Sequence, residues 1–261
     1  MIELAIIATV PLLLAVEGEV VVQRAGMINL GIEGMMLVAA MATVLFGVAG
    51  GIGGAIFVAA LFGVFSIALK ADQIVTGTAI NLFALGITGF IYREWNDRFT
   101  RVSEIDSTTT AIAAWIVVPV ALAFLLWRTR YGLRLRACGE NPEAVRAAGY
   151  SVTKLRWSAL MIEALLVGIA GADLARTGFA ENLTAGRGFI ALSIVIFGRW
   201  KLKGVVLGSA VFGAAAALQY ALQAANRGVQ FHLLLAVPYV VTLLILCGIA
   251  GRVRAPEALG K

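Results

Sequence analysis

The sequence has few of the residues that catalytic and metal sites need. Its 261 residues include one histidine, His232, and two cysteines, Cys138 and Cys247, with no metal-ligand spacing among them. There is no Gly-rich phosphate-binding loop followed by a lysine, because the only Gly-Lys pair is Gly260-Lys261. The sequence therefore predicts no catalytic residue, no metal site and no cofactor held by this chain.

Charged residues are also scarce. They make up 14% of the chain, hydrophobic residues make up 61%, and the mean hydropathy is +0.93. A chain of this composition cannot cover itself with polar surface, so most of its exterior is expected to face lipid. The net charge of +6 does not indicate nucleic-acid binding, because the basic residues cluster at the ends of apolar runs. We expect the lipid bilayer, and no nucleic acid, among its partners.

The apolar runs predict an all-α fold, a polytopic integral membrane helical bundle with about eight or nine spans. The runs cover 2–16, 27–48, 53–69, 74–92, 111–127, 157–176, 188–198, 204–224 and 231–250. The first and the seventh are short for a span of about 20 residues, so we expect broken or re-entrant helices there. The whole chain, 1–261, is expected to form a single transmembrane domain.

The distribution of Lys and Arg predicts the orientation of these spans. The loop 128–156 holds seven of the chain's 21 Lys/Arg and only two acids, so we assign it to the cytoplasm. We then expect Cys138, in this loop, to react with thiol reagents from the cytosolic side only. Alternation of the spans places four further segments inside: 17–24, Lys70, 199–203 and 252–261. It places three segments outside: the turns 50–54 and 226–228, and the loop 93–110.

The basic loop contains a short helix whose two ends are marked in the sequence. Asn141 is a typical N-cap, Pro142 suits the first helical position, and Gly149 suits a left-handed stop. Such a helix is about 10 Å long at ~1.5 Å per residue, which is too short to be stable alone. It needs a surface to dock against, which suggests a partner in the cytosol.

Three polar stretches interrupt the apolar runs. The first, AGMINLGIEGMM, is rich in glycine, which predicts a broken helix whose backbone faces a cavity. The others are ADQIVTGTAINL at 71–82 and the start of the Gly-rich segment ENLTAGRGFIALSIVIFGRWKLKG at 181–204. Their amide and hydroxyl groups would suit a neutral, hydroxyl-bearing solute, although hydrogen bonding between helices is the commoner use of such groups. The candidate residues of a substrate path are Asn29, Glu33, Gln73, Thr76, Asn81, Asn182 and Thr184.

Acids inside apolar runs are functional candidates because their burial is costly. Glu33 has two readings: it faces the path, or it lies near the cytoplasmic interface, solvated or paired with Arg24. For Glu163 we expect an interfacial pair with a basic residue at the end of the 128–156 loop, Lys154 or Arg156. For Asp173 we expect a pair with Arg176 on the outer side.

Four stretches together carry a family resemblance: AGMINLGIEGMM, KADQIVTGTAINLFALG, GLRLRACGENPEAVRAAGYSVTKLRW and ENLTAGRGFIALSIVIFGRW. They resemble the permease subunits of bacterial ABC importers for nucleosides and simple sugars, and the nucleoside-type branch more than the ribose or branched-chain amino-acid branches. In such permeases the GENPEAVRAAG segment looks like the coupling helix that sits in a groove of the ATPase. The residues to which the resemblance gives this role are Gly139, Glu140, Asn141, Pro142, Glu143, Ala144, Ala147, Ala148 and Gly149.

The resemblance implies a transport subunit and no enzyme, located in the bacterial inner membrane. ATP and Mg would be bound by a separate ABC ATPase subunit. The other implied partners are a second permease subunit, related in sequence or a copy of this chain, and an extracytoplasmic solute-binding lipoprotein. An ion-coupled carrier or channel is the alternative, and it would need acids in the middle of spans and transport without ATP. An intramembrane enzyme would need a catalytic pair, which the lone His232 does not supply.

Overall fold

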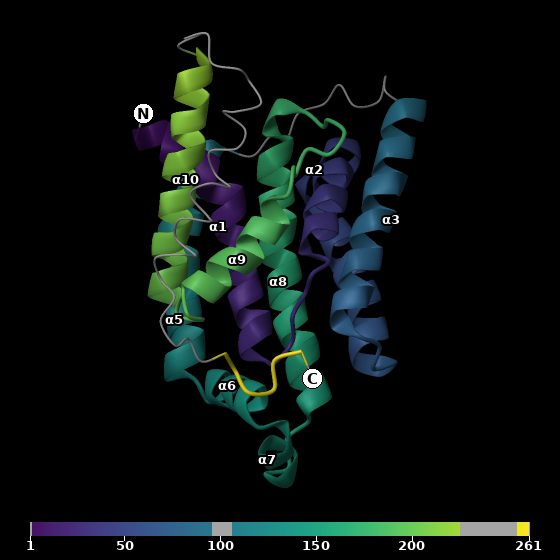
Figure 1. The fold of residues 1–261 in the computed structure, drawn as a ribbon, viewed down its shortest axis with the longest axis vertical. Helices are drawn as coiled ribbons and strands as arrows, with labels where there is room; N and C mark the ends of the chain where they lie inside the picture. The colour runs from purple at the N-terminus through teal and green to yellow at the C-terminus, as the bar shows by residue number, and fades with distance from the viewer. Residues whose placement is uncertain (1, 96–105, 225–254, 261) are drawn as a thin grey trace.

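The structure, a computed structural model, describes residues 2–95, 106–224 and 255–260 (Figure 1). All regular elements within these residues are helical. Five helical segments are long and apolar enough to cross a membrane: Ala5–Arg24, Ile32–Ala68, Gln73–Glu94, Ser107–Arg128 and Val152–Thr177. The chain is therefore a helical membrane protein, with five candidate spans in its described part. The last predicted run, 231–250, lies outside the described residues, as do His232, Cys247 and the turn 226–228.

The first helix, α1 (Ile2–Arg24), is longer than the apolar run that predicts it. It continues through 17–24, so this segment is the last part of the helix, and it ends at Arg24 beside Gly139. Hydropathy ends the run at Glu17 because acids are costly in lipid, but both Glu17 and Glu19 are 0% exposed. They are covered by protein, since α1 packs against α8 (Val152–Leu174) and α10 (Leu202–Ala224). The first run is thus part of a full-length helix.

Residues 25–31 are not helical, as the glycine-rich AGMINLG stretch predicts. The next helix, α2 (Ile32–Gly63), contains one non-helical residue, Gly47, with φ 76° and ψ −177°. A Cβ on Gly54 would lie 3.1 Å from the Ala42 Cβ and 3.4 Å from Val38 Cγ1. Residues on the two sides of Gly47 are therefore neighbours, and the chain reverses there. The runs 27–48 and 53–69 correspond to these two arms, and the reversal comes before the predicted turn at 50–54.

The next two spans follow the predicted runs closely. After the π-helical turn η1 (Val64–Ala68), the N-cap Asp72 accepts hydrogen bonds from Ile74 N and Val75 N at 2.9 Å and begins α3 (Gln73–Glu94). The following span consists of α4 (Ser107–Ile112), η3 (Ala113–Val117) and α5 (Val118–Arg128). Large apolar side chains on their outer faces are exposed in the isolated chain, among them Phe83, Phe90 and Phe124. These faces suit lipid or an apolar protein partner.

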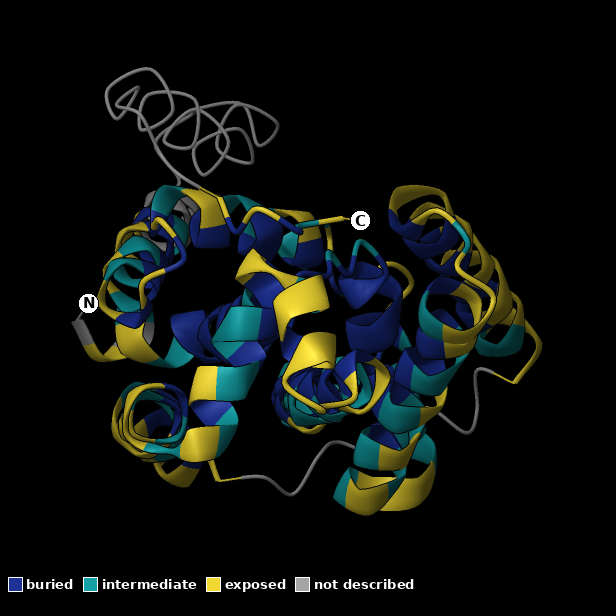
Figure 2. Cartoon of the chain, turned by 90° about the horizontal axis from the view of Figure 1, so that it is seen from below, coloured by how far each residue is buried: buried dark blue, intermediate teal, exposed yellow. Residues whose placement is uncertain are grey.

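Helix α8 packs against both α1 and α2, and these three helices supply most of the core (Figure 1). Seen from below, the buried residues gather between the helices and the exposed ones lie on the outward faces (Figure 2). The predicted short run 188–198 is α9 (Arg187–Phe197), which has 11 residues and follows the short 3-10 turn η4 (Ala175–Thr177) and a loop. At about 16 Å, α9 is half the hydrocarbon thickness of about 30 Å, as expected for a broken segment.

One end of the bundle gathers the segments that the charge pattern assigns to the cytoplasm (Figure 1). It carries α6 (Arg130–Glu140), α7 (Pro142–Ala147) and the C-terminal residues 255–260. Lys70 lines a cavity at this end together with residues of α7. The arrangement agrees with the alternation of spans, because all these segments come together although they are far apart in the sequence.

Candidate functional site

The short helix α7 has the ends that the sequence predicts. Asn141 is its N-cap, and its side-chain oxygen accepts a hydrogen bond from Ala144 N at 3.0 Å. Pro142 takes the first helical position, where no backbone N–H is needed. Gly149 has φ 82°, the left-handed conformation that ends helices. The local residues thus determine where this helix begins and ends.

An apolar contact packs α7 against α6 and α8. Val145 is buried and packs with Cys138, Val152 and Leu155. The other residues predicted to couple, from Glu140 to Gly149, are exposed or half-buried. Among these, Ala144, Ala147 and Ala148 form a surface of small side chains, which lets another protein approach the helix backbone closely. The helix is the element that projects farthest from the bundle (Figure 1).

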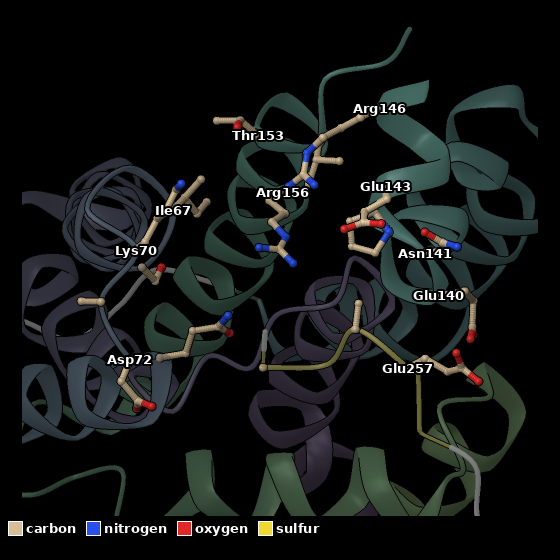
Figure 3. A pocket seen from close by; sticks show the side chains of 17 residues that line it. Ile67, Lys70, Asp72, Glu140, Asn141, Glu143, Arg146, Thr153, Arg156 and Glu257 are labelled. Atoms are coloured by element: carbon tan, nitrogen blue, oxygen red, sulfur yellow. The ribbon is translucent and has the colours of Figure 1, made fainter. Parts of the chain in front are cut away.

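A cavity of about 800 Å³ opens beside α7 (Figure 3). Its charged lining residues carry both signs: Lys70, Asp72, Glu140, Glu143, Arg146, Arg156 and Glu257. They come from the start of α3, from α6 and α7, from the start of α8, and from the C-terminal residues. A polar hollow with charges of both signs suits a protein surface and not a lipid tail.

Gly139, just before α7, belongs to a junction of three segments. A Cβ on this residue would collide with the backbone oxygen of Arg24, at the end of α1. The Gly139 oxygen accepts a hydrogen bond from Ala258 N at 2.9 Å, and Gly26 O accepts one from Gly260 N at 3.2 Å. The base of α7 is therefore in backbone contact with the start of the broken segment 25–31.

Cys138 does not have the exposure that its place in a basic loop suggests. Its side chain is 0% exposed and packs in the apolar cluster under α7. Burial raises the pKa of the Cys138 thiol, which lowers the fraction of reactive thiolate. The expectation that Cys138 is labelled from the cytosol is therefore wrong. The polar sequence around Cys138 does not reveal its burial, because Val145 of α7 packs over this residue in the folded chain.

The orientation can instead be tested with an introduced cysteine. Ala147 is exposed on α7, so we expect Ala147→Cys to be labelled rapidly by an impermeant thiol reagent in inside-out vesicles and not in intact cells. The unchanged chain, whose Cys138 is buried, serves as the control and should give little labelling at this position from either side. Labelling of Ala147→Cys in intact cells would reverse the orientation.

The polar residues predicted to line a path converge in part on the broken segment 25–31. Gln73 Oε1 accepts a hydrogen bond from Ile28 N at 2.7 Å. Asn81 Oδ1 accepts one from Gly34 N at 2.8 Å, and Asn81 Nδ2 donates to Leu30 O at 2.7 Å. These two side chains of α3 thus satisfy backbone groups that the missing helix turns leave open. Thr76, one turn after Gln73, is buried beside them.

Asn29 is the third amide of this group, and it lies within the broken segment itself. Its Nδ2 donates to Glu163 Oε2 at 2.8 Å. Glu163 is 0% exposed and does not form the expected interfacial pair with Lys154 or Arg156. The helix α8 begins at Val152, earlier than the apolar run suggests, which places Glu163 three turns inside it, at about 3.6 residues per turn.

Glu33, at the start of α2, connects this helix to the loop before α9. Its carboxylate accepts a hydrogen bond from Gly186 N at 2.7 Å and another from Gly188 N at 2.6 Å. These N–H groups begin α9, where a helix attracts negative charge. The reading of Glu33 as solvated or paired with Arg24 is wrong, because Arg24 donates to Trp200 O instead. Glu33 is 8% exposed and could reach this loop only through the tertiary fold.

The remaining candidates lie in the loop before α9 and at the outer end of α8. Thr184 is 0% exposed, and Asn182 is exposed with φ 56°, so Asn182 is not brought to the broken segment. The predicted pair of Asp173 with Arg176 is confirmed, with Arg176 Nε 3.1 Å from Asp173 Oδ1. Thr110 Oγ1 also donates to Asp173, at 3.0 Å.

Residues of α1 that the sequence reading passes over belong to the same region. Glu19 accepts a hydrogen bond from Asn29 N at 3.3 Å and one from Gln23 Nε2 at 2.7 Å. Gln23 Oε1 in turn accepts one from Trp200 Nε1 at 2.6 Å. The sequence contained a sign of this buried position, because Glu19 and Gln23 follow an apolar run and the three residues between them are all valine.

Comparison with known proteins decides the family. A family model described as branched-chain amino acid transport system / permease component matches residues 1–246. The chain belongs to this permease family. It is a transport subunit, and the apolar helices place it in the plasma membrane as a multi-pass protein. No solved structure matches the chain.

Three relatives show the range of the similarity. The chain is 31% identical to the nucleoside ABC transporter permease protein NupC of Lactococcus lactis subsp. cremoris, over 76% of this chain and 70% of that protein. It is 32% identical to the guanosine ABC transporter permease protein NupQ of Bacillus subtilis, over 75% and 70%. It is also 32% identical to a putative glucose ABC transporter permease protein, TsgC13 of Haloferax volcanii, over 81% and 74%.

Removing the amides that hold the broken segment should reduce uptake by this permease. In Asn81→Ala, Gly34 N and Leu30 O lose their partners, and an unsatisfied buried group costs about 1–3 kcal/mol. We expect uptake to fall roughly tenfold or more, since ~1.4 kcal/mol is a factor of ten in rate, and we expect Asn29→Ala to act in the same direction. Initial uptake rates in vesicles measure both.

The matched control for these variants is Thr78→Ala. Thr78 lies on the exposed side of the same helix, and its hydroxyl donates to Ile74 O within that helix. Complex assembly should be normal in all three proteins. Wild-type uptake in Asn29→Ala and Asn81→Ala would return these amides to a dispensable packing role.

Proposed function

We propose that this permease forms the membrane path of an ATP-driven ABC importer for nucleosides. The observation that carries the substrate class is the similarity to NupC and NupQ, which are named for nucleoside and guanosine transport and match over about three quarters of this chain. The sugar transporter TsgC13 matches at similar identity. A nucleoside contains a sugar, so a related sugar-containing solute is the neighbouring possibility within the same class.

ATP hydrolysis would drive this transport from a separate subunit. The exposed helix α7 and the polar cavity beside it offer a docking surface at one end of the bundle. The proposed occupant is an ABC ATPase that binds ATP and Mg. A second permease, related to this chain or a copy of it, would complete the path, and an extracytoplasmic lipoprotein would deliver the solute.

The path itself is proposed to run beside the broken segment 25–31 and the short helix α9. The amides of Asn29, Gln73 and Asn81 support this path by fixing the backbone of the broken segment. We propose about eight or nine membrane crossings in total. The two arms of α2 cross separately, and α10 and residues 231–250 add two more crossings to the candidate spans of the described part.

Reconstituted vesicles test this function directly. The permease, its ATPase, its second permease and its lipoprotein are assembled, and uptake of labelled guanosine is measured with and without ATP. We expect uptake only with ATP, competition by other nucleosides, and weaker competition by ribose or by leucine. We also expect the purified permease alone to bind no ATP, because its sequence has no phosphate-binding loop.

The alternative function is an ion-coupled carrier or channel for a small polar solute, and the same vesicle experiment distinguishes it from the ATP-driven importer. Guanosine uptake by the permease alone, driven by an ion gradient without ATP, would contradict the importer. Preferential competition by a free sugar would keep the importer and change its substrate class. Stoichiometric ATP binding to the permease alone would contradict its role as a subunit without nucleotide chemistry.

A further inference from the structure

Two acids from different membrane-spanning helices meet at the broken segment. Glu19 lies on α1 and Glu163 on α8, and both side chains are 0% exposed. Asn29 contacts both of them: its backbone N donates to Glu19 Oε1 at 3.3 Å, and its Nδ2 donates to Glu163 Oε2 at 2.8 Å. α1 and α8 are in close contact here, since a Cβ on Gly18 would lie 3.0 Å from the Glu163 Cα. One residue of the broken segment therefore holds two carboxyl groups together.

Each carboxyl group leaves one oxygen without a donor. Glu19 Oε2 and Glu163 Oε1 are buried and have no hydrogen-bond partner among the described residues. The two carboxyl groups nevertheless lie side by side, because Asn29 bonds to both of them and Gly18 of α1 lies against the Glu163 backbone. Two ionised carboxylates have only acceptors and repel each other, whereas a protonated carboxyl has an O–H that donates to its neighbour. The contact is therefore favourable only if the pair carries a proton.

The charged groups on the surrounding elements do not replace that proton. On α1, Arg24 donates to Trp200 O. On α2, Glu33 is bound to the start of α9, and Arg187 of α9 donates to Leu183 O. On α8, Arg156 precedes Glu163 by two helical turns, about 10 Å along the axis, and lines the cavity at the end of the bundle.

The remaining neighbours add no cation to the pair either. On α6, which packs against α1 and α8, Arg130 is exposed, Arg134 lies over the Tyr150 ring and Arg136 lies over the Trp127 ring. The broken segment 25–31 contains no charged residue. Glu17, on α1, is fully buried, and both its oxygens have no partner among the described residues. It is a further acid and cannot neutralise the pair. On α10, Lys203 is exposed near the helix start.

We propose that Glu19 and Glu163 form a proton-binding site, which holds one shared proton and thereby fixes the broken segment between α1 and α8. With the proton bound, the O–H of one carboxyl donates to the other, and Asn29 bridges the two. When the proton is released to water, two adjacent negative charges separate the carboxyls, and Asn29 can no longer contact both. The position of the broken segment therefore depends on pH, whichever solute is transported.

Infrared spectroscopy of the purified full chain tests the shared proton without any transport assay. The readout is the C=O absorption of protonated carboxyl groups near neutral pH, recorded in a Glu17→Gln background so that Glu17 does not contribute. We expect Glu19→Gln and Glu163→Gln each to remove one carboxyl absorption. We expect the double variant to remove no more than either single one, because both substitutions remove the same proton.

Either of two results would overturn the shared proton. If neither the single variants nor the double variant lose an absorption, both carboxyls are ionised. If the double variant loses twice as much as a single one, each carboxyl has its own proton. Glutamine keeps the shape and the hydrogen-bonding capacity of a protonated glutamate, so these variants are expected to fold.

A cysteine-labelling experiment, with Glu19 and Glu163 unchanged, tests whether the position of the broken segment depends on pH. Ile28→Cys places a thiol in the half-buried part of this segment, and the exposed Ala147→Cys corrects for the ionisation of thiols with pH. We expect the labelling ratio of Ile28→Cys to Ala147→Cys to rise severalfold as the pH increases. In Glu163→Gln, whose amide replaces the proton, the ratio should be constant. A ratio that does not change with pH in the wild-type pair would refute the pH-dependent fixing of the segment.

Discussion

Ala147→Asp should abolish coupled transport while leaving the membrane helices intact. Ala147 is exposed on α7, and in the proposed assembly it lies against the ATPase. An aspartate there places a charge in a closed contact, and an unpaired buried charge costs about 3–5 kcal/mol. That cost corresponds to a loss of roughly 100-fold or more in ATPase association. We expect uptake to fall with it, as measured by co-purification of the ATPase and by guanosine uptake.

Gly149→Val should act on the same contact by a different cause. Gly149 has φ 82°, and a Cβ built on it would meet no atom within 4 Å. Any effect of valine therefore comes from the left-handed backbone, which costs an ordinary L-residue roughly 1–2 kcal/mol. We expect the end of α7 to shift and ATP hydrolysis to become less responsive to solute.

Each of these changes has a control of similar size. Ala147→Ser adds a small neutral group, and Gly149→Asn places a residue that tolerates the left-handed conformation. Both controls should couple normally. If Ala147→Asp and Gly149→Val also retain normal ATPase association and uptake, then α7 is a solvated connection and its assignment as a coupling helix is wrong.

Glu33→Gln should reduce uptake by about ten- to a hundredfold. The carboxylate accepts hydrogen bonds from Gly186 N and Gly188 N, and each hydrogen bond to a charged group contributes about 1.5–3 kcal/mol. A glutamine retains one acceptor and turns its NH₂ toward the other N–H, so one bond is replaced by a repulsive contact. The loop before α9 then loses its connection to the broken segment, and each ~1.4 kcal/mol lost is a tenfold change in rate.

The control for this variant is another acid of the same loop, Glu181. It pairs with Arg93, which lowers the pKa of the Glu181 carboxyl, but both side chains are well exposed, and exposed pairs contribute little. Glu181→Gln should therefore transport almost normally. Uptake rates, compared at equal amounts of assembled complex, distinguish a transport defect from poor folding. Equal rates for both variants would show that the contact of Glu33 with α9 is dispensable.

The comparison of α7 with Cys138 shows what a local sequence can predict. Asn141, Pro142 and Gly149 act on the backbone within a few residues, so the ends of α7 are readable from the sequence alone. The burial of Cys138 is not readable in this way. It depends on how Val145, Val152 and Leu155 fold around it, and a basic loop gives no sign of that packing.

The sequence by itself determined the features that arise from composition and short-range geometry. The apolar runs exclude an exterior that is covered by water, and the glycines predict the break in the helix at 25–31. Four sequence motifs indicate the permease family. Tertiary structure alone decided the partners of the buried polar groups. Glu33 reaches the start of α9, and Asn29 joins Glu19 to Glu163. The physical reason is that hydropathy scores each acid against lipid, whereas the cost of burying it depends on donors that the fold brings from distant positions.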